Sequence, residues 1–192
     1  MTALDRPKTT KVALVTGSSK NIGRAIAQAL AKSGSHIVVH AAHDQAAAEE
    51  SLSLIESEGV EGMLTLGDLT DPDTVTRIFN EVINRFGQLD TLVNNAAVRP
   101  EAPFAELTFT EWRRVMSICL DAAFLTSQAA LKPLQESEAG SIINIGGLTA
   151  HTGAPNRAHV VSAKAGLVGF TKALSHELSP TGITVNCVAP GL

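Results

Sequence analysis

The residues with the clearest chemical potential form a turn near the start of the chain, Thr16-Gly17-Ser18-Ser19-Lys20-Asn21-Ile22-Gly23. The turn follows the apolar run Val12–Val15 and opens a segment with helical spacing, so it would join a buried strand to a helix. Backbone N–H groups at a helix start attract anions, and glycines let the chain turn tightly. The pattern predicts a phosphate-binding turn, with an ordinary strand-to-helix loop as the alternative.

Other residues with metal-binding or redox potential are scattered. His36, His40 and His43 fall along a predicted strand and its exit, without cysteine or carboxylate partners at the spacing of metal ligands, so we predict no metal site. The two cysteines, Cys119 and Cys187, also lack metal-ligand spacing and are too few for a disulfide framework. This usage is typical of a reducing compartment.

Length and composition limit the class of protein. The 192 residues suit one domain with a core of its own, and 44% hydrophobic against 18% charged residues argues against disorder. A formal net charge of -4 argues against a nucleic-acid partner. The start of the chain has no apolar signal region, and no run approaches the roughly 20 apolar residues that span a bilayer. We therefore expect a soluble, cytoplasmic protein with no membrane partner.

Short β-branched runs alternate with longer amphipathic segments along the whole chain. We predict strands at residues 12–15, 37–39, 63–66, 89–93, 141–145 and 183–188, and helices at 22–32, 44–58, 71–87, 110–130 and 157–178. Such alternation predicts βαβ units, and hence an α/β fold with a parallel sheet and helices on both faces. No linker, low-complexity tract or repeat divides the chain, so we predict a single domain.

Four motifs resemble those of the short-chain dehydrogenase/reductase family, and particularly of its 3-oxoacyl-acyl-carrier-protein reductase-like members. The turn is similar to the family's Thr-Gly-x-x-x-Gly-x-Gly, with Asn21 in place of the middle glycine, and the other matches are Asp68-Leu69, Asn94-Asn95-Ala96-Ala97 and Pro190-Gly191. The resemblance covers nearly the whole chain. It implies a Rossmann-like, doubly wound sheet, and it implies that the C-terminal part of the usual domain, a substrate-covering region, is missing after Pro190-Gly191.

The resemblance implies a nicotinamide dinucleotide cofactor. The residues that it assigns to cofactor binding are Gly17, Ser19, Lys20, Asn21, Ile22, Gly23, Asp68, Leu69, Asn95, Ala96, Lys164, Pro190 and Gly191. Asparagine tolerates positive φ better than most residues, so we expect the turn to form with Asn21.

The end of the second predicted strand bears on the choice of cofactor. A free ribose 2′-OH prefers a carboxylate there, whereas a 2′-phosphate needs a cation. The strand ends Val39-His40-Ala41-Ala42 without a carboxylate, while Lys20 lies in the turn and His43 could assist if protonated. These residues favour NADP(H) over NAD(H), with a solvated loop lysine as the alternative interpretation of Lys20.

The family's catalytic set of tyrosine, lysine, serine and asparagine is mostly replaced. By resemblance, Lys164 matches the lysine, while Val160, Gly147 and Cys119 stand at the tyrosine, serine and asparagine positions, and the sequence contains no tyrosine. Valine and glycine cannot donate a proton, so the usual carbonyl chemistry is not available from these positions. The Cys119 thiol is a weak donor on an apolar helix face, and we interpret it as a small core residue.

Three further side chains could approach the pocket around Lys164. Arg157 shares a helical face with Val160 and Lys164, where it could bind an anionic ligand or be an ordinary surface arginine. His159 points roughly 100° away from that face, so we predict a surface or interface histidine. His151 could reach the pocket from the loop after Gly147, but a solvated side chain is the expectation.

Two functions stay open at this level, and a third ranks below them. One is an NADP(H)-dependent oxidoreductase with an atypical active site that transfers hydride to or from a carbonyl or alcohol. The other is a non-catalytic relative that binds a nucleotide or serves as a partner subunit. A purely structural protein would make the glycine turn and Lys164 coincidental. By resemblance, the helices around Trp112 and Lys164 are dimer faces, which predicts a homodimer or homotetramer.

Overall fold

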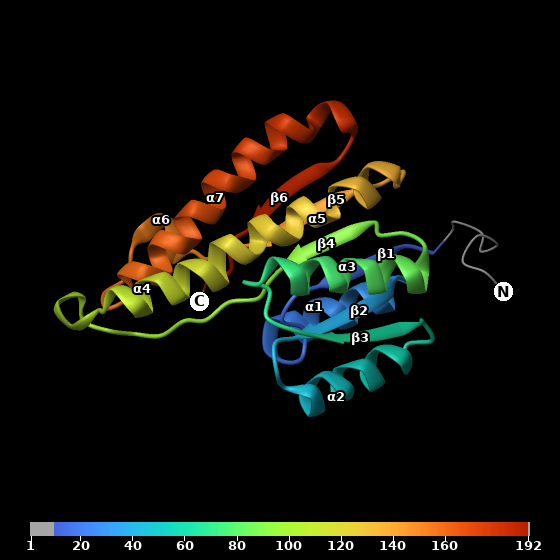
Figure 1. The fold of residues 1–192 in the computed structure, drawn as a ribbon, viewed down its shortest axis with the longest axis horizontal. Coiled ribbons are helices and arrows are strands. Elements are labelled where there is room, and N and C mark those ends of the chain that lie inside the picture. Colours follow the sequence, from blue (N-terminus) through green and yellow to red (C-terminus); the bar gives the residue numbers. More distant parts are fainter. Residues whose placement is uncertain (1–9, 192) are drawn as a thin grey trace.

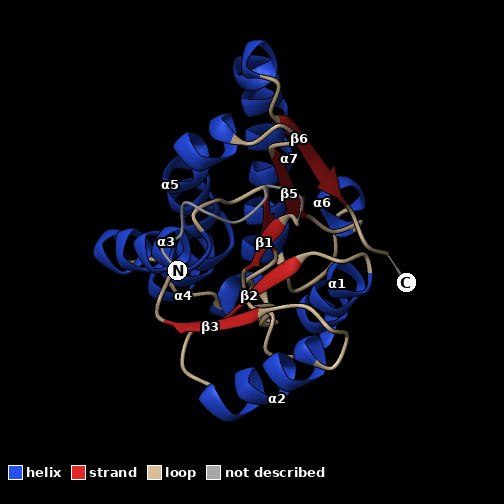
Figure 2. Cartoon of the chain, turned by 90° about the vertical axis from the view of Figure 1, so that its right-hand side faces the viewer, coloured by secondary structure: helices blue, strands red, loops and turns tan. Residues whose placement is uncertain are grey.

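The computed structural model describes residues 10–191. Within this range a parallel sheet runs in the order β3-β2-β1-β4-β5-β6, so the chain starts in the middle and winds outward in both directions (Figures 1 and 2). The strands are β1 (Val12–Val15), β2 (His36–Ala41), β3 (Gly62–Leu66), β4 (Thr91–Asn94), β5 (Ser141–Ile145) and β6 (Thr184–Val188). The order confirms the predicted doubly wound Rossmann-like fold.

Helices cover both faces of the sheet. They are α1 (Asn21–Lys32), α2 (Gln45–Glu56), α3 (Pro72–Phe86), α4 (Phe109–Met116), α5 (Ala122–Glu136), α6 (Thr149–Thr152) and α7 (Ala158–Leu178), with 3₁₀ turns at Phe104–Glu106 and Ser179–Thr181. One apolar core lies between the sheet and α1 and α2, and the other lies between the sheet and α3, α5 and the end of α7. Successive residues of β1 point alternately into the two cores, which is why its whole sequence is apolar.

Local sequence signals determine the ends of α3. The Asp71 side chain accepts a hydrogen bond from the Thr74 N–H, and Pro72 follows in the first turn, where it costs no backbone bond. Gly87 ends the helix with φ +73°, in the left-handed region that favours glycine. This helix therefore begins and ends where the sequence predicts.

The helix predicted over residues 110–130 is present, but it contains a π-helical segment that the sequence did not predict. The chain forms α4, then a π-helical segment at Ser117–Asp121, and then α5, which runs on to Glu136. A π segment adds one residue to a turn and rotates the faces on either side of it. Cys119 lies in this segment and is buried.

The predicted bounds of β1 and β5 match the structure, and those of the other strands differ by one or two residues; Leu89 and Asp90, for example, precede β4. The Asp90 carboxylate accepts a bond from the Val12 N–H at 2.8 Å, so this residue joins the start of β1 to the start of β4. Among residues 10–191, no helix is both long and apolar enough to cross a membrane.

Candidate functional site

The glycine turn forms a close backbone cradle between β1 and α1. Gly17 has φ +62° and Asn21 has φ +51°, so two residues of the turn lie in the left-handed region. A Cβ on Gly17 would lie 3.0 Å from Ala96 Cα, and a Cβ on Gly23 would lie 2.5 Å from Asn95 Nδ2 and overlap the Gly17 carbonyl oxygen. The conformation of the turn therefore depends on glycine at positions 17 and 23.

The start of α1 is chemically different from the starts of α2 and α3. The side chains of Asp44 and Asp71 cap α2 and α3, whereas Lys20 precedes α1 in an extended conformation and makes no side-chain cap bond in the described chain. The first backbone N–H groups of a helix need partners, and an anion can supply them. The cradle and the uncapped helix start fit a phosphate group.

The Asn94–Ala97 segment holds the turn in place. Asn95 Nδ2 donates to the carbonyl oxygens of Thr16 at 2.9 Å and Gly17 at 3.1 Å. The Thr16 hydroxyl in turn accepts bonds from the backbone N–H groups of Asn95 at 2.9 Å and Ala96 at 3.0 Å. Asn95 and Ala96 thus contact the turn itself, which is how they can shape a ligand site.

The outer side of the turn is fastened to α2. Arg24 donates to the Ser19 carbonyl oxygen at 2.6 Å and forms an ion pair with Glu50 at 2.9 Å. The Ser51 hydroxyl donates to the same Ser19 oxygen at 2.8 Å. Ile22 stays exposed at the start of α1.

Lys20 forms an ion pair with Asp44 at the start of α2, in which Lys20 Nζ lies 3.0 Å from Asp44 Oδ2. The hydrogen bond from Lys20 and the backbone N–H of Ala47 hold the pKa of Asp44 below its usual value. The two side chains are 60% and 47% exposed, so solvent screens the pair and either partner can exchange it for another ion. Asp44, which sequence reasoning did not single out, brings a carboxylate close to the end of β2.

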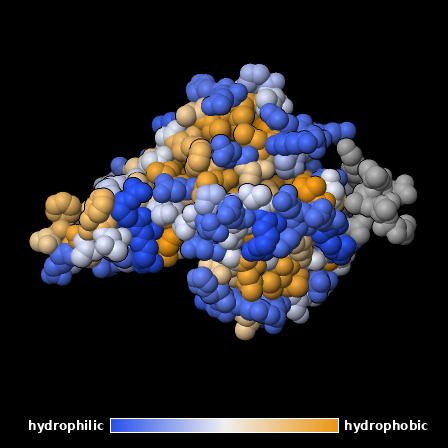
Figure 3. All heavy atoms as spheres, in the orientation of Figure 1, coloured by the Kyte–Doolittle hydropathy of each residue, from blue (hydrophilic) through white to orange (hydrophobic). Residues whose placement is uncertain are grey.

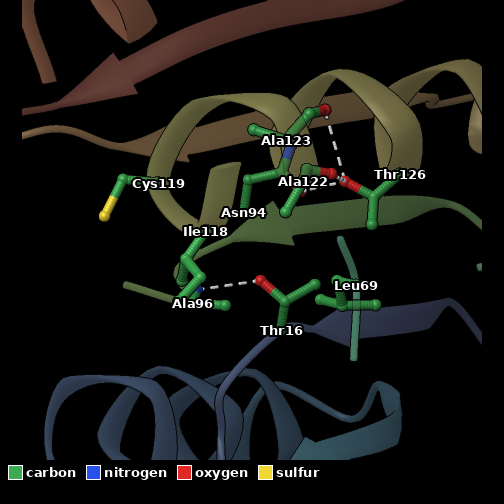
Figure 4. Close-up of a pocket in the computed structure, with 9 residues that line it drawn as sticks. All are labelled: Thr16, Leu69, Asn94, Ala96, Ile118, Cys119, Ala122, Ala123 and Thr126. Carbon is green, nitrogen blue, oxygen red and sulfur yellow. Dashed lines mark hydrogen bonds between the residues drawn. The ribbon is translucent and has the colours of Figure 1, made fainter. Parts of the chain in front are cut away.

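The Asp68-Leu69 pair follows β3. Asp68 Oδ1 accepts bonds from the Thr70 N–H and hydroxyl, both at 2.9 Å, which shapes the turn into α3. Leu69 is buried and lines a small pocket between the ends of β1 and β4 and the start of α5 (Figure 4). The pocket brings Leu69 together with Thr16, Ala96 and Cys119, residues that the sequence assigned to separate motifs.

Lys164 lies on α7 with its amine at the end of β5. The residue is only 5% exposed, and its Nζ donates to the Ile145 carbonyl oxygen at 2.5 Å. Burial lowers the pKa of this amine, against the opposing effects of the Cys119 and Cys187 sulfurs, and Arg99 lowers it further. Among residues 10–191 this is the one hydrogen bond that the amine makes, so two of its three N–H positions have no partner there.

Val160, Gly147 and Cys119 carry no hydroxyl. Val160 is buried one turn earlier on α7 and packs in an apolar cluster with Val115, Cys119 and Ala163. A Cβ on Gly147 would meet nothing closer than Thr149 Oγ1 at 3.9 Å, so the backbone there borders open space. The Cys119 thiol contacts the Val98 carbonyl oxygen at 3.5 Å and is buried, as expected of a small core residue.

The Pro190-Gly191 segment lies beside the loop after β5. The Leu148 N–H donates to the Pro190 carbonyl oxygen at 3.0 Å. A Cβ on Gly191 would lie 3.0 Å from Leu148 Cδ2. The fold therefore brings Gly147, Lys164 and Pro190 to one edge of the sheet, the edge that also holds the glycine turn.

The three further side chains that the sequence suggested near Lys164 are Arg157, His151 and His159, and their surroundings differ. Arg157 pairs with Glu101 through two hydrogen bonds, so its guanidinium already has an anionic partner. His151 is exposed on α6. The predicted surface position of His159 is wrong: the residue is fully buried, and neither ring nitrogen has a hydrogen-bond partner among residues 10–191. The reason is that α7 packs against α4 and the π segment as well as the sheet, so more than one of its faces is covered.

Two sets of contacts escaped the sequence analysis. Asn94 Nδ2 donates to Asn144 Oδ1 at 2.9 Å, and the Thr126 hydroxyl donates to Asn94 Oδ1 at 2.7 Å, so a buried polar network joins β4, β5 and α5. Asn94 and Asn144, near the ends of apolar strands, were the sequence signal that could have predicted this network. His40 forms the second set through both of its ring nitrogens. No cluster of His, Cys, Asp and Glu suited to a metal ion occurs within residues 10–191.

Comparison with known protein sequences gives a consistent picture. The model of the family described as "short chain dehydrogenase" matches residues 11–192. A 3-oxoacyl-[acyl-carrier-protein] reductase of Synechocystis is 37% identical over 191 residues, which are 100% of this chain and 76% of the relative. A reductase of the same name from Staphylococcus aureus is 38% identical over 184 residues, which are 96% of this chain and 75% of the relative.

Solved structures agree in fold. A putative short-chain alcohol dehydrogenase from Sinorhizobium meliloti superposes with a TM-score of 0.90 at 34% identity, covering 94% of this chain and 71% of that one. Acetoin dehydrogenase YohF from Salmonella typhimurium gives a TM-score of 0.90 at 36% identity, covering 95% of this chain and 73% of that one. The chain thus spans about three quarters of the length of these proteins.

Proposed function

Because the chain belongs to the short-chain dehydrogenase family of oxidoreductases, we propose that it binds NADP(H) and transfers hydride between this cofactor and a carbonyl or alcohol. The observation that supports binding most strongly is the cradle in which Gly17 and Gly23 leave room for no side chain. The uncapped start of α1 beside it suits the pyrophosphate. A bound cofactor would supply the hydride, while Lys164 would hold the nicotinamide ribose through its remaining N–H groups.

The proposed preference for NADP(H) rests on Lys20. Its exposed ion pair with Asp44 can open, so that the ammonium meets a 2′-phosphate instead. We expect Lys20→Ala to weaken NADPH binding by about tenfold, because a charge-assisted bond to phosphate is lost, and to leave NADH binding within about twofold. Asp44→Asn should act in the opposite sense and strengthen NADPH binding, because it removes a negative charge from beside the phosphate.

Fluorescence titration of the purified chain with NADPH and NADH tests both statements. The two single variants serve as each other's control, since they remove opposite charges from one ion pair. Equal affinity for the two cofactors in the unmodified chain, or an equal response of both cofactors to Lys20→Ala, would contradict the preference. Binding of neither cofactor would contradict the proposed function.

The replacements around Lys164 favour a second candidate, a nucleotide-binding relative without catalytic turnover. Val160 belongs to an apolar cluster and Gly147 carries no hydroxyl, so neither can give a proton to a carbonyl oxygen. A panel of carbonyl compounds, followed at the nicotinamide absorbance with bound NADPH, separates the two candidates. Turnover supports hydride transfer, and binding without turnover supports the second.

An engineered pair of substitutions tests the assignment of these positions. Gly147→Ser fits the space beside Thr149, and Val160→Tyr would add a phenol one helical turn from Lys164. We expect the double variant to reduce carbonyls faster than either the unmodified chain or Gly147→Ser alone, by about a hundredfold for a positioned general acid. A folded double variant that binds NADPH without such a gain would contradict the assignment.

Self-association is part of the proposal. Phe109 on α4 and Phe124 on α5 are 77% and 47% exposed, and Phe104, in the 3₁₀ turn before α4, is 78% exposed. Apolar side chains gather on the surface of the projecting end of the molecule that holds α4 and the chain before it (Figure 3). Apolar side chains this exposed are more often found where subunits meet. We propose a homodimer or homotetramer, and light scattering on the eluting protein would refute this by giving the mass of one chain.

A further inference from the structure

His40 connects the two segments that surround the glycine turn. Its ring Nδ1 accepts a hydrogen bond from the Gly17 N–H at 3.1 Å, and its Nε2 lies 3.0 Å from the Gly67 carbonyl oxygen. A backbone N–H can only donate and a carbonyl oxygen can only accept. The contacts therefore define a neutral imidazole with its proton on Nε2.

The backbone of His40 strengthens the same connection. Its N–H donates to the Ser18 hydroxyl at 3.0 Å, and its carbonyl oxygen accepts from the Ser18 N–H at 2.9 Å. The end of β2 is thus joined to two successive residues of the turn. On the other side, Gly67 directly precedes the Asp68-Leu69 pair.

We propose that His40 is a positioning residue for dinucleotide binding, whose neutral ring keeps the Gly17 end of the turn in the conformation that receives phosphate. This inference rests on the proposed function, because it concerns the same cofactor. Protonation would place an N–H on Nδ1 opposite the Gly17 N–H. Two donors cannot share a hydrogen bond, so the turn would have to move.

The surroundings of the ring keep it neutral near pH 7. His40 is buried, and burial lowers the pKa of its ring. The Gly67 carbonyl oxygen and the Asp68 carboxylate raise this pKa in part, whereas Arg77 on α3 lowers it further. Cofactor binding should therefore weaken as the pH falls to the lowered pKa of His40, which lies below 6.5, by no more than tenfold per pH unit for a single proton. The 2′-phosphate of the cofactor titrates too, so a comparison of variants is required.

The matched control is His36, at the opposite end of the same strand. Its Nδ1 accepts from the Glu61 N–H at 3.0 Å, which resembles the His40 contact, but its ring stacks on Phe86, away from the turn. His40→Asn retains an acceptor for the Gly17 N–H and cannot titrate. His40→Leu offers no acceptor at all.

The experiment is a calorimetric titration with NADP⁺ at several values between about pH 7.5 and about pH 5.5. We expect the affinity of the unmodified chain and of His36→Asn to fall more steeply on acidification than the affinity of His40→Asn does. At the upper pH, His40→Asn should bind within about fivefold of the unmodified chain, whereas His40→Leu should bind at least about tenfold more weakly.

Parallel pH profiles for the unmodified chain and His40→Asn would overturn the inference while leaving cofactor binding, and so the proposed function, intact. An affinity that rises on acidification only when His40 is present would also overturn it, because the ring would then act as a cation toward phosphate. No binding at any pH would contradict the proposed function and this inference together. If a variant fails to fold, ¹⁵N NMR of the unmodified chain decides: a His40 proton on Nδ1 at neutral pH would refute the positioning role.

Discussion

A single methyl group at position 23 should destabilise the protein, although the same change elsewhere should stabilise it. Gly23 and Gly169 both lie within helices, α1 and α7, where alanine is intrinsically favoured over glycine by about 1 kcal/mol. A Cβ at Gly169 meets no atom within 4 Å, so Gly169→Ala should gain most of that amount. A Cβ at Gly23 overlaps the Gly17 carbonyl oxygen and lies 2.5 Å from Asn95 Nδ2.

The size of the effect follows from the contacts that must give way. Asn95 Nδ2 makes two hydrogen bonds, to Thr16 and Gly17, each of which contributes about 1 kcal/mol, and displacing it leaves both carbonyl oxygens without that donor. Overpacking against a backbone costs a further 1–3 kcal/mol, roughly. We therefore expect Gly23→Ala to lower the free energy of unfolding by about 3 kcal/mol net, or the melting temperature by about 6–12 °C.

Thermal and urea unfolding of the two variants, with NADPH titration of each, form the assay. Gly169→Ala should melt about 2 °C higher than the unmodified chain and bind NADPH normally, whereas Gly23→Ala should melt lower and lose binding. If both variants shift the melting temperature in the same direction by similar amounts, the close approach of α1 to the turn is not required for the fold, and the reasoning is refuted.

Three other predictions concern single side chains. Asn21→Gly should raise the free energy of unfolding, measured in urea, by about 1 kcal/mol, because Asn21 has φ +51° and glycine takes this conformation without strain. Unchanged stability would argue against that backbone geometry. His159→Leu should raise the free energy of unfolding by about 1 kcal/mol, because the buried ring has no hydrogen-bond partner among residues 10–191. The control His151→Leu, at an exposed position, should change the free energy of unfolding by less than about 0.5 kcal/mol. Destabilisation by His159→Leu would reveal a partner for the ring. The folded-state pKa of His40 lies below its unfolded value of 6.5, so the folded state binds fewer protons, and stability should be fully present above about pH 6.5 and fall with acidification toward the folded pKa, by at most about 1.4 kcal/mol per pH unit. Urea unfolding of His40→Asn should show a shallower acid dependence than the unmodified chain, and equal slopes would count against the linkage.

Local patterns were sufficient for most of the fold. The alternation of strands and helices appears in the residues themselves, because a strand buried on both faces needs a continuous apolar run and a surface helix needs one apolar stripe. The ends of α3 could be predicted because Asp71, Pro72 and Gly87 act through their own backbone and near neighbours. The turn at Thr16–Gly23 could be predicted for the same reason, because its glycines indicate a positive φ or a close approach of two backbone segments.

Local patterns failed where several elements meet. The π segment at Ser117–Asp121 interrupts a continuous helical pattern, since one extra residue in a turn leaves no distinct composition. His159 was assigned to the surface because a helical wheel describes one buried face, whereas α7 also packs against α4 and the π segment. Lys20 was considered without Asp44, 24 residues further on, whose side chain reaches it only because α2 begins beside the turn.

The sequence alone determined that the chain has no tyrosine and carries glycine at position 147 and valine at position 160, because residue identities do not depend on conformation. It also determined the fold class, since periodicity and turn residues act over a few neighbours. Only the tertiary structure decided how His40 is used. Its two ring partners, Gly17 and Gly67, lie 23 and 27 residues away, and they meet the ring because parallel pairing aligns the ends of β1, β2 and β3 at one edge of the sheet.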